Sequence, residues 1–187
     1  TIDGPITLAT AAITITTADD NINLQGTVDG GKALTLASGS GAVTVDGAIG
    51  SSTALTSLTV NSSGTGIIEI TNIGTASASG VTGATAIGNT NTGTLTFDGT
   101  VYTTNAATYT AATGENIDLT GGATTTFTSS NDNITFGTAT VEMANGSNLV
   151  IDTDTLGGAI DLTGGVMGTS AENITLTAGT GTVAIGS

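Results

Sequence analysis

The chain has 187 residues, of which 29 are Gly and 43 are Thr, and a single basic residue, Lys32, stands against fifteen acidic ones. The formal net charge is −14 at pH 7, and His, Cys and Trp are absent. This composition excludes an imidazole base, a thiolate nucleophile and the common zinc sites. It also opposes binding to nucleic acid or to an anionic membrane surface, because like charges repel.

The residue types also bear on where the protein works. No segment as long as a membrane span is predominantly apolar, so we expect no membrane insertion. The scarcity of Lys and Arg beside abundant Thr, Ser, Asn and Gly favours an extracellular or cell-surface protein. The chain begins at Thr1, and no charged segment precedes an apolar stretch. We therefore expect a mature product or a segment of a longer polypeptide.

A short apolar–polar–apolar motif recurs along nearly the whole chain, and each occurrence predicts a strand with one buried face. In chain order the predicted strands are 6–8, 13–15, 22–24, 34–36, 43–45, 58–60, 68–70, 95–97, 117–119, 134–136, 141–143, 149–151, 160–162, 174–176 and 183–185. Gly, Asn, Asp and Ser fill the gaps and favour turns. A helix has no support, because no segment has a helical period and Thr and Gly oppose helix formation.

The spacing of these strands predicts a solenoid. The sequence IDLTGG at residues 117–122 recurs at 160–165, and residues 34–45 resemble residues 174–185. We interpret the first offset as two coils of about 21–22 residues, each with three short strands. The predicted fold is all-β: a right-handed parallel β-helix with about three short strands per coil of roughly 20–24 residues, and about eight coils in total.

Two segments depart from the pattern. Residues 72–94 carry Ala and Gly where aliphatic residues are expected, and residues 99–114 contain both tyrosines, Tyr102 and Tyr109. We expect irregular coils or a protruding loop there, within one domain that spans residues 1–187. The tyrosines could anchor a ligand or partner, or they could fill an apolar gap in a wide coil.

The segments LTLASGSGAVTVDGAIG at 34–50 and ENITLTAGTGTVAIGS at 172–187 resemble large bacterial surface exoproteins. These are the β-solenoid adhesins similar to filamentous haemagglutinin, and other giant repeat proteins of outer surfaces. The resemblance covers nearly the whole chain, as a style of repeat and not as a specific motif. It implies an exported rod that serves adhesion, scaffolding or filament formation, and it assigns no site residues.

Both ends of the chain lie in strand pattern and show no cap. A solenoid without caps exposes strand edges and apolar core, so we expect these ends to pair with other β-coils. The partners would be further copies, joined head to tail into a homopolymer, or neighbouring repeats of a longer chain. The predicted interface residues are Ile2, Ile6, Leu8, Ile174, Leu176, Val183 and Ile185.

The acidic side chains are the only candidates for catalytic groups in this sequence. The candidate groups are Asp19 with Asp20, Glu115 with Asp118, and Asp152 with Asp154. Glycosidases place two carboxylates in a cleft, but they also bind sugars through aromatic and basic side chains, which are scarce here. We therefore predict no enzyme activity, and we expect the acids to cap turns and keep the rod soluble.

Calcium is the one cofactor that the sequence suggests. Asp152 and Asp154 alternate on one strand face and could bind a calcium ion together with Asp161.

Pairs such as Thr14 and Thr16 also suggest that the protein binds ice, but such pairs do not recur at a constant interval along the chain. We therefore interpret them as ordinary residues of a solvent-facing strand.

The sequence thus predicts a non-catalytic structural protein of the cell exterior. It would be a β-helical rod that stacks end to end into an extracellular filament, or forms part of one. The alternative is a glycan- or surface-binding segment of a large adhesin. A groove or exposed loop around Tyr102 and Tyr109 would favour that alternative.

Overall fold

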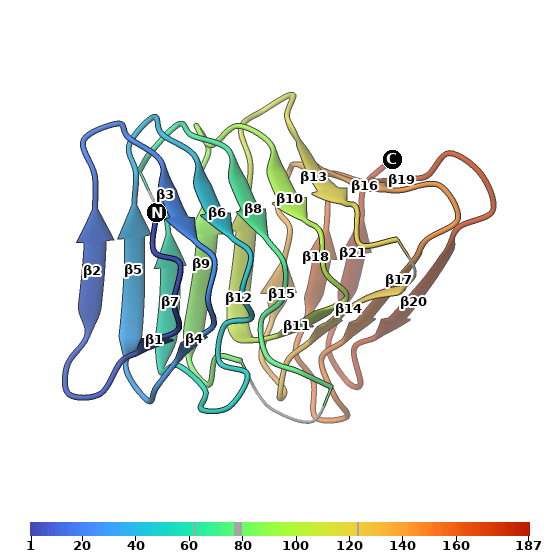
Figure 1. Ribbon diagram of the computed structural model, residues 1–187. Helices are drawn as coiled ribbons and strands as arrows, with labels where there is room; N and C mark the ends of the chain where they lie inside the picture. Colours follow the sequence, from blue (N-terminus) through green and yellow to red (C-terminus); the bar gives the residue numbers. More distant parts are fainter. Residues whose placement is uncertain (62, 77–79, 123) are drawn as a thin grey trace.

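The computed structural model describes residues 1–61, 63–76, 80–122 and 124–187, and it shows a β-solenoid of about seven turns (Figure 1). All elements among these residues are strands, and every strand pair is parallel. The predicted all-β parallel solenoid is confirmed. No helix of the length and apolarity needed to cross a membrane occurs in the described part of the chain.

Three faces of parallel strands build the stack. The eight-stranded sheet contains, in spatial order, β2 (Ile13–Thr16), β5 (Ala33–Ala37), β7 (Ser57–Val60), β9 (Ala84–Gly88), β12 (Asn105–Thr110), β15 (Ile134–Thr135), β18 (Ile160–Leu162) and β21 (Val183–Ile185). The seven-stranded sheet contains β3 (Ile22–Leu24), β6 (Val43–Val45), β8 (Ile68–Ile70), β10 (Leu95–Phe97), β13 (Asn116–Leu119), β16 (Thr140–Met143) and β19 (Val166–Met167).

The third face changes in width along the stack. It begins with β1 (Ile6–Thr7) and β4 (Val28–Asp29), continues through single bridges at Ile49 and Ile73, and ends with β11 (Val101–Thr103), β14 (Thr124–Thr128), β17 (Asn148–Asp152) and β20 (Asn173–Thr177). One bridging residue per coil is therefore replaced by longer strands in the later coils.

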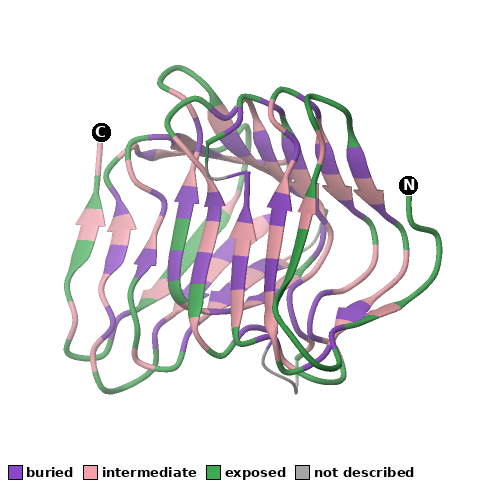
Figure 2. Ribbon diagram, turned by 90° about the vertical axis from the view of Figure 1, so that its left-hand side faces the viewer, coloured by how far each residue is buried: buried purple, intermediate pink, exposed green. Residues whose placement is uncertain are grey.

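Alternation along each strand builds the core. Aliphatic side chains point inward and stack on the equivalent residues of the next coil, about 4.8 Å away. One such row runs from Ile6 to Leu176, with the aromatic residues Tyr102 and Phe127 among its aliphatic members. Figure 2 shows buried positions alternating with more exposed ones along the strands.

The coils are less uniform in length than expected. Ile22 pairs with Val43 in one coil step, whereas Ile68 pairs with Leu95 in another, and the second pair is further apart along the chain. The step from Ile68 to Leu95 is longer than the predicted coil. The strands at the two ends of this longer step remain in register, with Ile70 opposite Phe97.

The interpretation of the repeated IDLTGG segment as two stacked coils is wrong. The first copy begins in β13 of the seven-stranded sheet, but the second begins in β18 of the eight-stranded sheet. The two copies do not stack as equivalent parts of coils. All three faces need the same apolar–polar–apolar strand followed by a glycine turn, so similar segments occur on different faces.

The two segments that depart from the sequence pattern contain strands. β9 lies within residues 72–94, of which 77–79 are outside the described residues, and β11 and β12 lie within 99–114. The pairing of β12 with β9 shifts register between Asn105 and Ala107, and Ala106 has a positive φ of 43°. A β-bulge is therefore the local irregularity in the second segment.

All five aromatic residues of the chain form one buried cluster at this level of the stack. The Phe97 ring lies 4.6 Å from the Tyr102 ring and 5.0 Å from the Tyr109 ring, measured between centroids. Phe127 and Phe136 continue the cluster into the next coil. The large rings fill the core where the third face widens.

Glycines at one corner let successive coils approach closely. Gly26, Gly47, Gly99 and Gly121 all follow strands of the seven-stranded sheet or directly precede the third face. A methyl group on any of them would overlap backbone atoms of the preceding coil. Hydrogen in place of a side chain is therefore required at this corner.

One buried hydroxyl group in the core lacks a hydrogen-bond partner. Thr85 is 1% exposed and lies in register between Leu58 and Ala107, where its Oγ1 atom has no partner. We expect Thr85→Val to raise the free energy of unfolding by about 1 kcal/mol, because an unpaired buried hydroxyl costs desolvation energy that a methyl group does not.

Urea unfolding measures this effect, and Thr104→Val is the matched control. Thr104 is also fully buried, but its Oγ1 atom lies 3.0 Å from the Tyr109 hydroxyl group. The control should be destabilised, because it leaves the Tyr109 hydroxyl unpaired. Equal losses in both variants would contradict the prediction.

Candidate functional site

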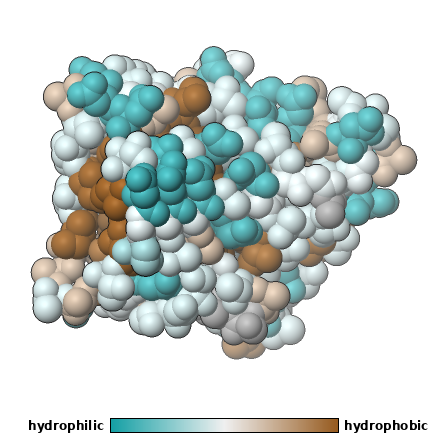
Figure 3. All heavy atoms as spheres, in the orientation of Figure 1, coloured by the Kyte–Doolittle hydropathy of each residue, from teal (hydrophilic) through white to brown (hydrophobic). Residues whose placement is uncertain are grey.

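The first coil leaves apolar side chains uncovered at one end of the stack. Ile2 bridges to Leu24 and is 41% exposed, and Ile13 at the start of β2 is 40% exposed. Ile6 in β1 is partly buried, whereas Leu8 is only 2% exposed. Figure 3 shows hydrophobic atoms gathered at the left, toward the end of the stack where β2 and the N-terminus lie.

The last coil leaves a similar set uncovered at the other end. Ile174 in β20 and Val183 in β21 are each 44% exposed, and Ile185 is 57% exposed. Leu176 is partly buried against the core. The two groups of predicted interface residues therefore lie in the first and the last coil, at opposite ends of the stack.

Three members of these end surfaces were not predicted from the sequence as interface residues. Ile13 and Ile15 belong to the first coil, and Met167 in β19 is 53% exposed in the last coil. The apolar–polar–apolar motif of residues 13–15 was available as a signal. Its place in the first coil could not be assigned without the register, which pairs Ile13 with Leu34.

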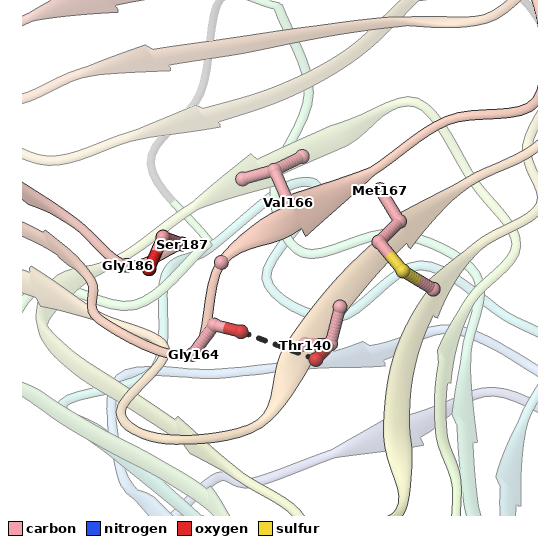
Figure 4. Close-up of a pocket in the computed structure, with 7 residues that line it drawn as sticks. Thr140, Gly164, Val166, Met167, Gly186 and Ser187 are labelled. Carbon is pink, nitrogen blue, oxygen red and sulfur yellow. Dashed lines mark hydrogen bonds between the residues drawn. The ribbon is translucent and has the colours of Figure 1, made fainter.

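A shallow hollow of about 230 Å³ lies in the last coil (Figure 4). Its lining residues are Thr140, Gly164, Gly165, Val166, Met167, Gly186 and Ser187. The Thr140 hydroxyl group donates a hydrogen bond to the carbonyl oxygen of Gly164, at 3.1 Å. The lining carries no side-chain charge, so it offers no group for acid–base catalysis.

The three candidate calcium ligands do not converge. Asp152 ends β17 on the third face, and Asp154 lies in the following turn, whereas Asp161 lies in β18 of the eight-stranded sheet. Oδ1 of Asp152 accepts the backbone N–H of Asp154, and Oδ1 of Asp161 accepts that of Thr163. No group of three acidic side chains able to hold a metal ion occurs among the described residues.

The tyrosines are not available as surface anchors. Tyr102 and Tyr109 are both fully buried, and burial raises the pKa of both phenols. The Tyr102 hydroxyl group donates to a backbone carbonyl of the seven-stranded sheet and accepts the N–H of Gly99. Of the two roles considered, filling the core is the one observed.

The other carboxylates mostly bind the chain itself. Oδ1 of Asp19 accepts the backbone N–H of Ser40, which lowers the pKa of Asp19, and Glu115 accepts the hydroxyl group of Thr94. Asp118 lies beside Glu142 in the register of β13 and β16. Burial raises the pKa of Asp118, and the charges of Glu142 and Glu115 raise it further.

Glu172 links the last coil to the coil before it. Its carboxylate accepts the backbone N–H of Ser170 at 2.8 Å and that of Gly146 at 3.1 Å. The Ser170 hydroxyl group also lies 2.6 Å from Oδ1 of Asn145. The hydrogen bond from Ser170 is the main reason that the pKa of Glu172 falls to about 2.

We expect the hydrogen bonds from Gly146 and Ser170 to the Glu172 carboxylate to weaken in acid. A carboxyl group whose pKa is lowered by folding stabilises the fold above its ordinary pKa, and that contribution is lost as pH falls toward the folded value. For Glu172 the loss should occur between its ordinary value of 4.5 and about 2. Hydrogen exchange at Gly146 and Ser170, corrected for intrinsic rates, should show less protection at pH 2.5 than at pH 5.

Glu172→Gln provides the control for this prediction. The variant should show reduced protection of both amides already at pH 5, and its protection should change less with pH. The same pH dependence in Glu172→Gln as in the wild type would show that another group causes it.

Comparisons with known proteins give no relative. No protein-family model, curated protein or solved structure matches the chain.

Proposed function

We propose that the protein is a non-catalytic structural rod of the cell exterior. In this proposal the rod stacks end to end into an extracellular filament, or forms part of one through neighbouring repeats of a longer chain. The observation that carries the proposal is the pair of end coils, where inward rows of aliphatic residues remain open. A further parallel coil placed on either end would continue both the backbone ladders and these rows.

The rows support a head-to-tail register. The row that begins at Ile6 ends at Leu176, and the row that begins at Ile13 ends at Val183. A second copy stacked in the same register would place Ile6 on Leu176 and Ile13 on Val183. Each contact would join two aliphatic side chains, as in the interior of the stack. Such a contact joins different surfaces and generates an open filament.

The two ends of the stack differ in the width of the third face. β1 contributes two residues to the third face, whereas β20 contributes five. A stacked copy would therefore cover only part of β20. The C-terminal end would be better matched by a coil with a wide third face, which favours neighbouring repeats of that kind as partners at this end.

Cell-exterior localisation is supported by composition, since polar uncharged residues cover a chain with a single Lys and no Arg. The structural role is supported by the hydrogen bonds that most of the candidate carboxylates make to the chain itself. The alternative role, a glycan- or surface-binding segment of an adhesin, lacks its expected contact surface because Tyr102 and Tyr109 are buried.

Electron microscopy of the purified chain tests the stacking, with and without a calcium chelator. Self-stacking predicts long fibres with an axial repeat of about 4.8 Å, whereas single rods would be about 35 Å long. Ile185→Asp should abolish the fibres by placing a charge in the end contact. Ile67→Asp is the matched control, because Ile67 is equally exposed, at 56%, but lies midway along the stack.

Fibres that persist in Ile185→Asp would contradict the end contact. Dispersed rods in the wild type would exclude self-stacking and leave neighbouring repeats as the only partners for the end coils.

A further inference from the structure

The outward surface of the eight-stranded sheet, here called the neutral face, is almost free of charge. Asp161 is the single charged residue within its eight strands. The seven-stranded sheet, in contrast, carries Glu69, Asp118 and Glu142 at outward positions of its strands. A protein with a net charge of −14 therefore has one long side whose strands carry only one charged residue.

The central row of the neutral face consists of small side chains in register. In spatial order it contains Thr14, Thr35, Thr59, Ala86, Thr108, Thr135, Asp161 and Ala184. The threonines align although their intervals along the chain vary, because the corners absorb the extra residues. Ala86, Asp161 and Ala184 interrupt the threonines, so the row is not a continuous threonine array.

We propose that the neutral face is a lateral docking surface for a second copy of this chain, related by a twofold axis that runs parallel to the strands between β9 and β12. This arrangement reverses the order of strands, so that β5 lies opposite β18 and β7 lies opposite β15. The proposal goes beyond end-to-end stacking and does not depend on it, because it uses a different surface.

The charges at the rim of the neutral face favour this arrangement. Lys32 directly precedes β5, and its side chain forms no ion pair within the described part of the chain. The axis brings Lys32 opposite the residues that precede β18 of the second copy, one strand away from Asp132, which precedes β15. Asp161 lies further along β18, in the central row. Lys32 of each copy therefore lies near an acidic region of the other copy, and the twofold axis makes this contact occur two times in the dimer.

Acidic residues elsewhere on the rim meet neutral segments. Glu115, which follows β12, would lie opposite residues 89–91 after β9, and these are Asn, Thr and Asn. Asp19 and Asp20, which follow β2, would lie opposite Gly186 and Ser187 after β21. The twofold arrangement thus places none of these acidic groups opposite another.

The area is sufficient for a weak association. Eight strands about 4.8 Å apart and on average about four residues long give roughly 500 Å² per copy, near the lower limit for a specific interface. We expect a dissociation constant on the order of 100 μM for the isolated chain. In a filament, many such contacts would act together and bundle rods laterally.

Sedimentation equilibrium of the chain tests the proposal. Thr59→Glu places a charge in the centre of the neutral face and should weaken dimerisation by about tenfold or more. Thr126→Glu is the matched control, because Thr126 occupies an outward position of β14 on the third face and, like Thr59, lies between uncharged residues. It should dimerise like the wild type, because its added charge lies outside the neutral face. Both variants have the same net charge, so they differ only in where the charge lies.

Charge reversal tests the symmetry. Lys32→Glu should weaken dimerisation, and Asp132→Lys with Asp161→Lys should weaken it although that variant has less net charge to repel. Combining all three substitutions should restore the wild-type dissociation constant. Restoration must occur between copies, because β5 and β18 are five strands, or about 24 Å, apart in one copy, beyond the range of a screened interaction.

The control for restoration combines Lys32→Glu with Asp118→Lys and Glu142→Lys, which gives the same net charge but alters the seven-stranded sheet. It should not restore dimerisation. Restoration by this control, or a wild-type chain that stays monomeric at about 1 mM, would overturn the proposal.

Two further outcomes identify another occupant. Association that survives Thr59→Glu but is abolished by Ile185→Asp would overturn the lateral contact while supporting end-to-end stacking. A monomeric chain whose adsorption to ice or to a crystalline polysaccharide is abolished by Thr59→Glu would assign the neutral face to that surface and overturn the dimer.

Discussion

Gly121→Ala is expected to destabilise the protein by about 3 kcal/mol, within the range that overpacking costs in well-packed structures. A methyl group at this position would overlap the carbonyl carbon and oxygen of Gly99 in the preceding coil. Both partners are backbone atoms, so relief requires the coils to separate and not merely a side chain to rotate. Denaturant unfolding, followed by far-ultraviolet circular dichroism, measures the loss.

The position of Gly121 gives this variant a second expected signature. Each coil of a solenoid contacts only its neighbours, so a defect between two coils uncouples the parts of the stack on either side. We therefore expect a shallower or two-step unfolding transition. Gly31→Ala is the control, since a methyl group there meets no atom within 4 Å. A loss in Gly31→Ala comparable to that in Gly121→Ala would contradict the corner argument.

Phe97→Ala is expected to cost about 3–5 kcal/mol, the usual range for removing a buried aromatic side chain. Phe97 is fully buried, and its ring contacts those of Tyr102, Tyr109 and Phe127 at centroid distances of 4.6, 5.0 and 5.1 Å. Its removal leaves a cavity at the level where the third face widens. The surrounding strands are fixed by their ladders and cannot collapse into it.

Hydrogen exchange measures where the loss occurs. Protection should fall first in β10, β11 and β12, which carry three of the rings, and less in β5 and β6 of the earlier coils. Phe97→Leu should cost less, because it preserves part of the buried volume. Uniform loss of protection along the whole stack would show that the aromatic cluster stabilises all coils equally.

Together, the two variants and the proposed surfaces describe a rod with three separable properties. Corner glycines and the aromatic cluster determine its internal stability. In the proposals above, the end coils determine whether the rod is extended, and the neutral face determines whether rods associate side by side. Because these residues are distinct, each property can be altered without the others.

The fold class and most of the strands could be predicted from the amino-acid sequence alone. Motifs such as Ile13-Thr14-Ile15 specify a strand with one buried face through local alternation alone, and the abundance of Thr and Gly removes the helical alternative. The end residues Ile2, Ile174 and Ile185 could also be named, because the strand pattern reaches both ends of these 187 residues.

The face that each strand joins, in contrast, can be seen only in the folded chain. The repeated IDLTGG segment belongs to two different sheets, since the three faces impose the same local pattern and corners vary in length. For the same reason, the threonine row of the neutral face is hidden in the sequence. Burial of Tyr102 and Tyr109 likewise depends on rings from other segments, those of Phe97, Phe127 and Phe136, so no single segment encodes it.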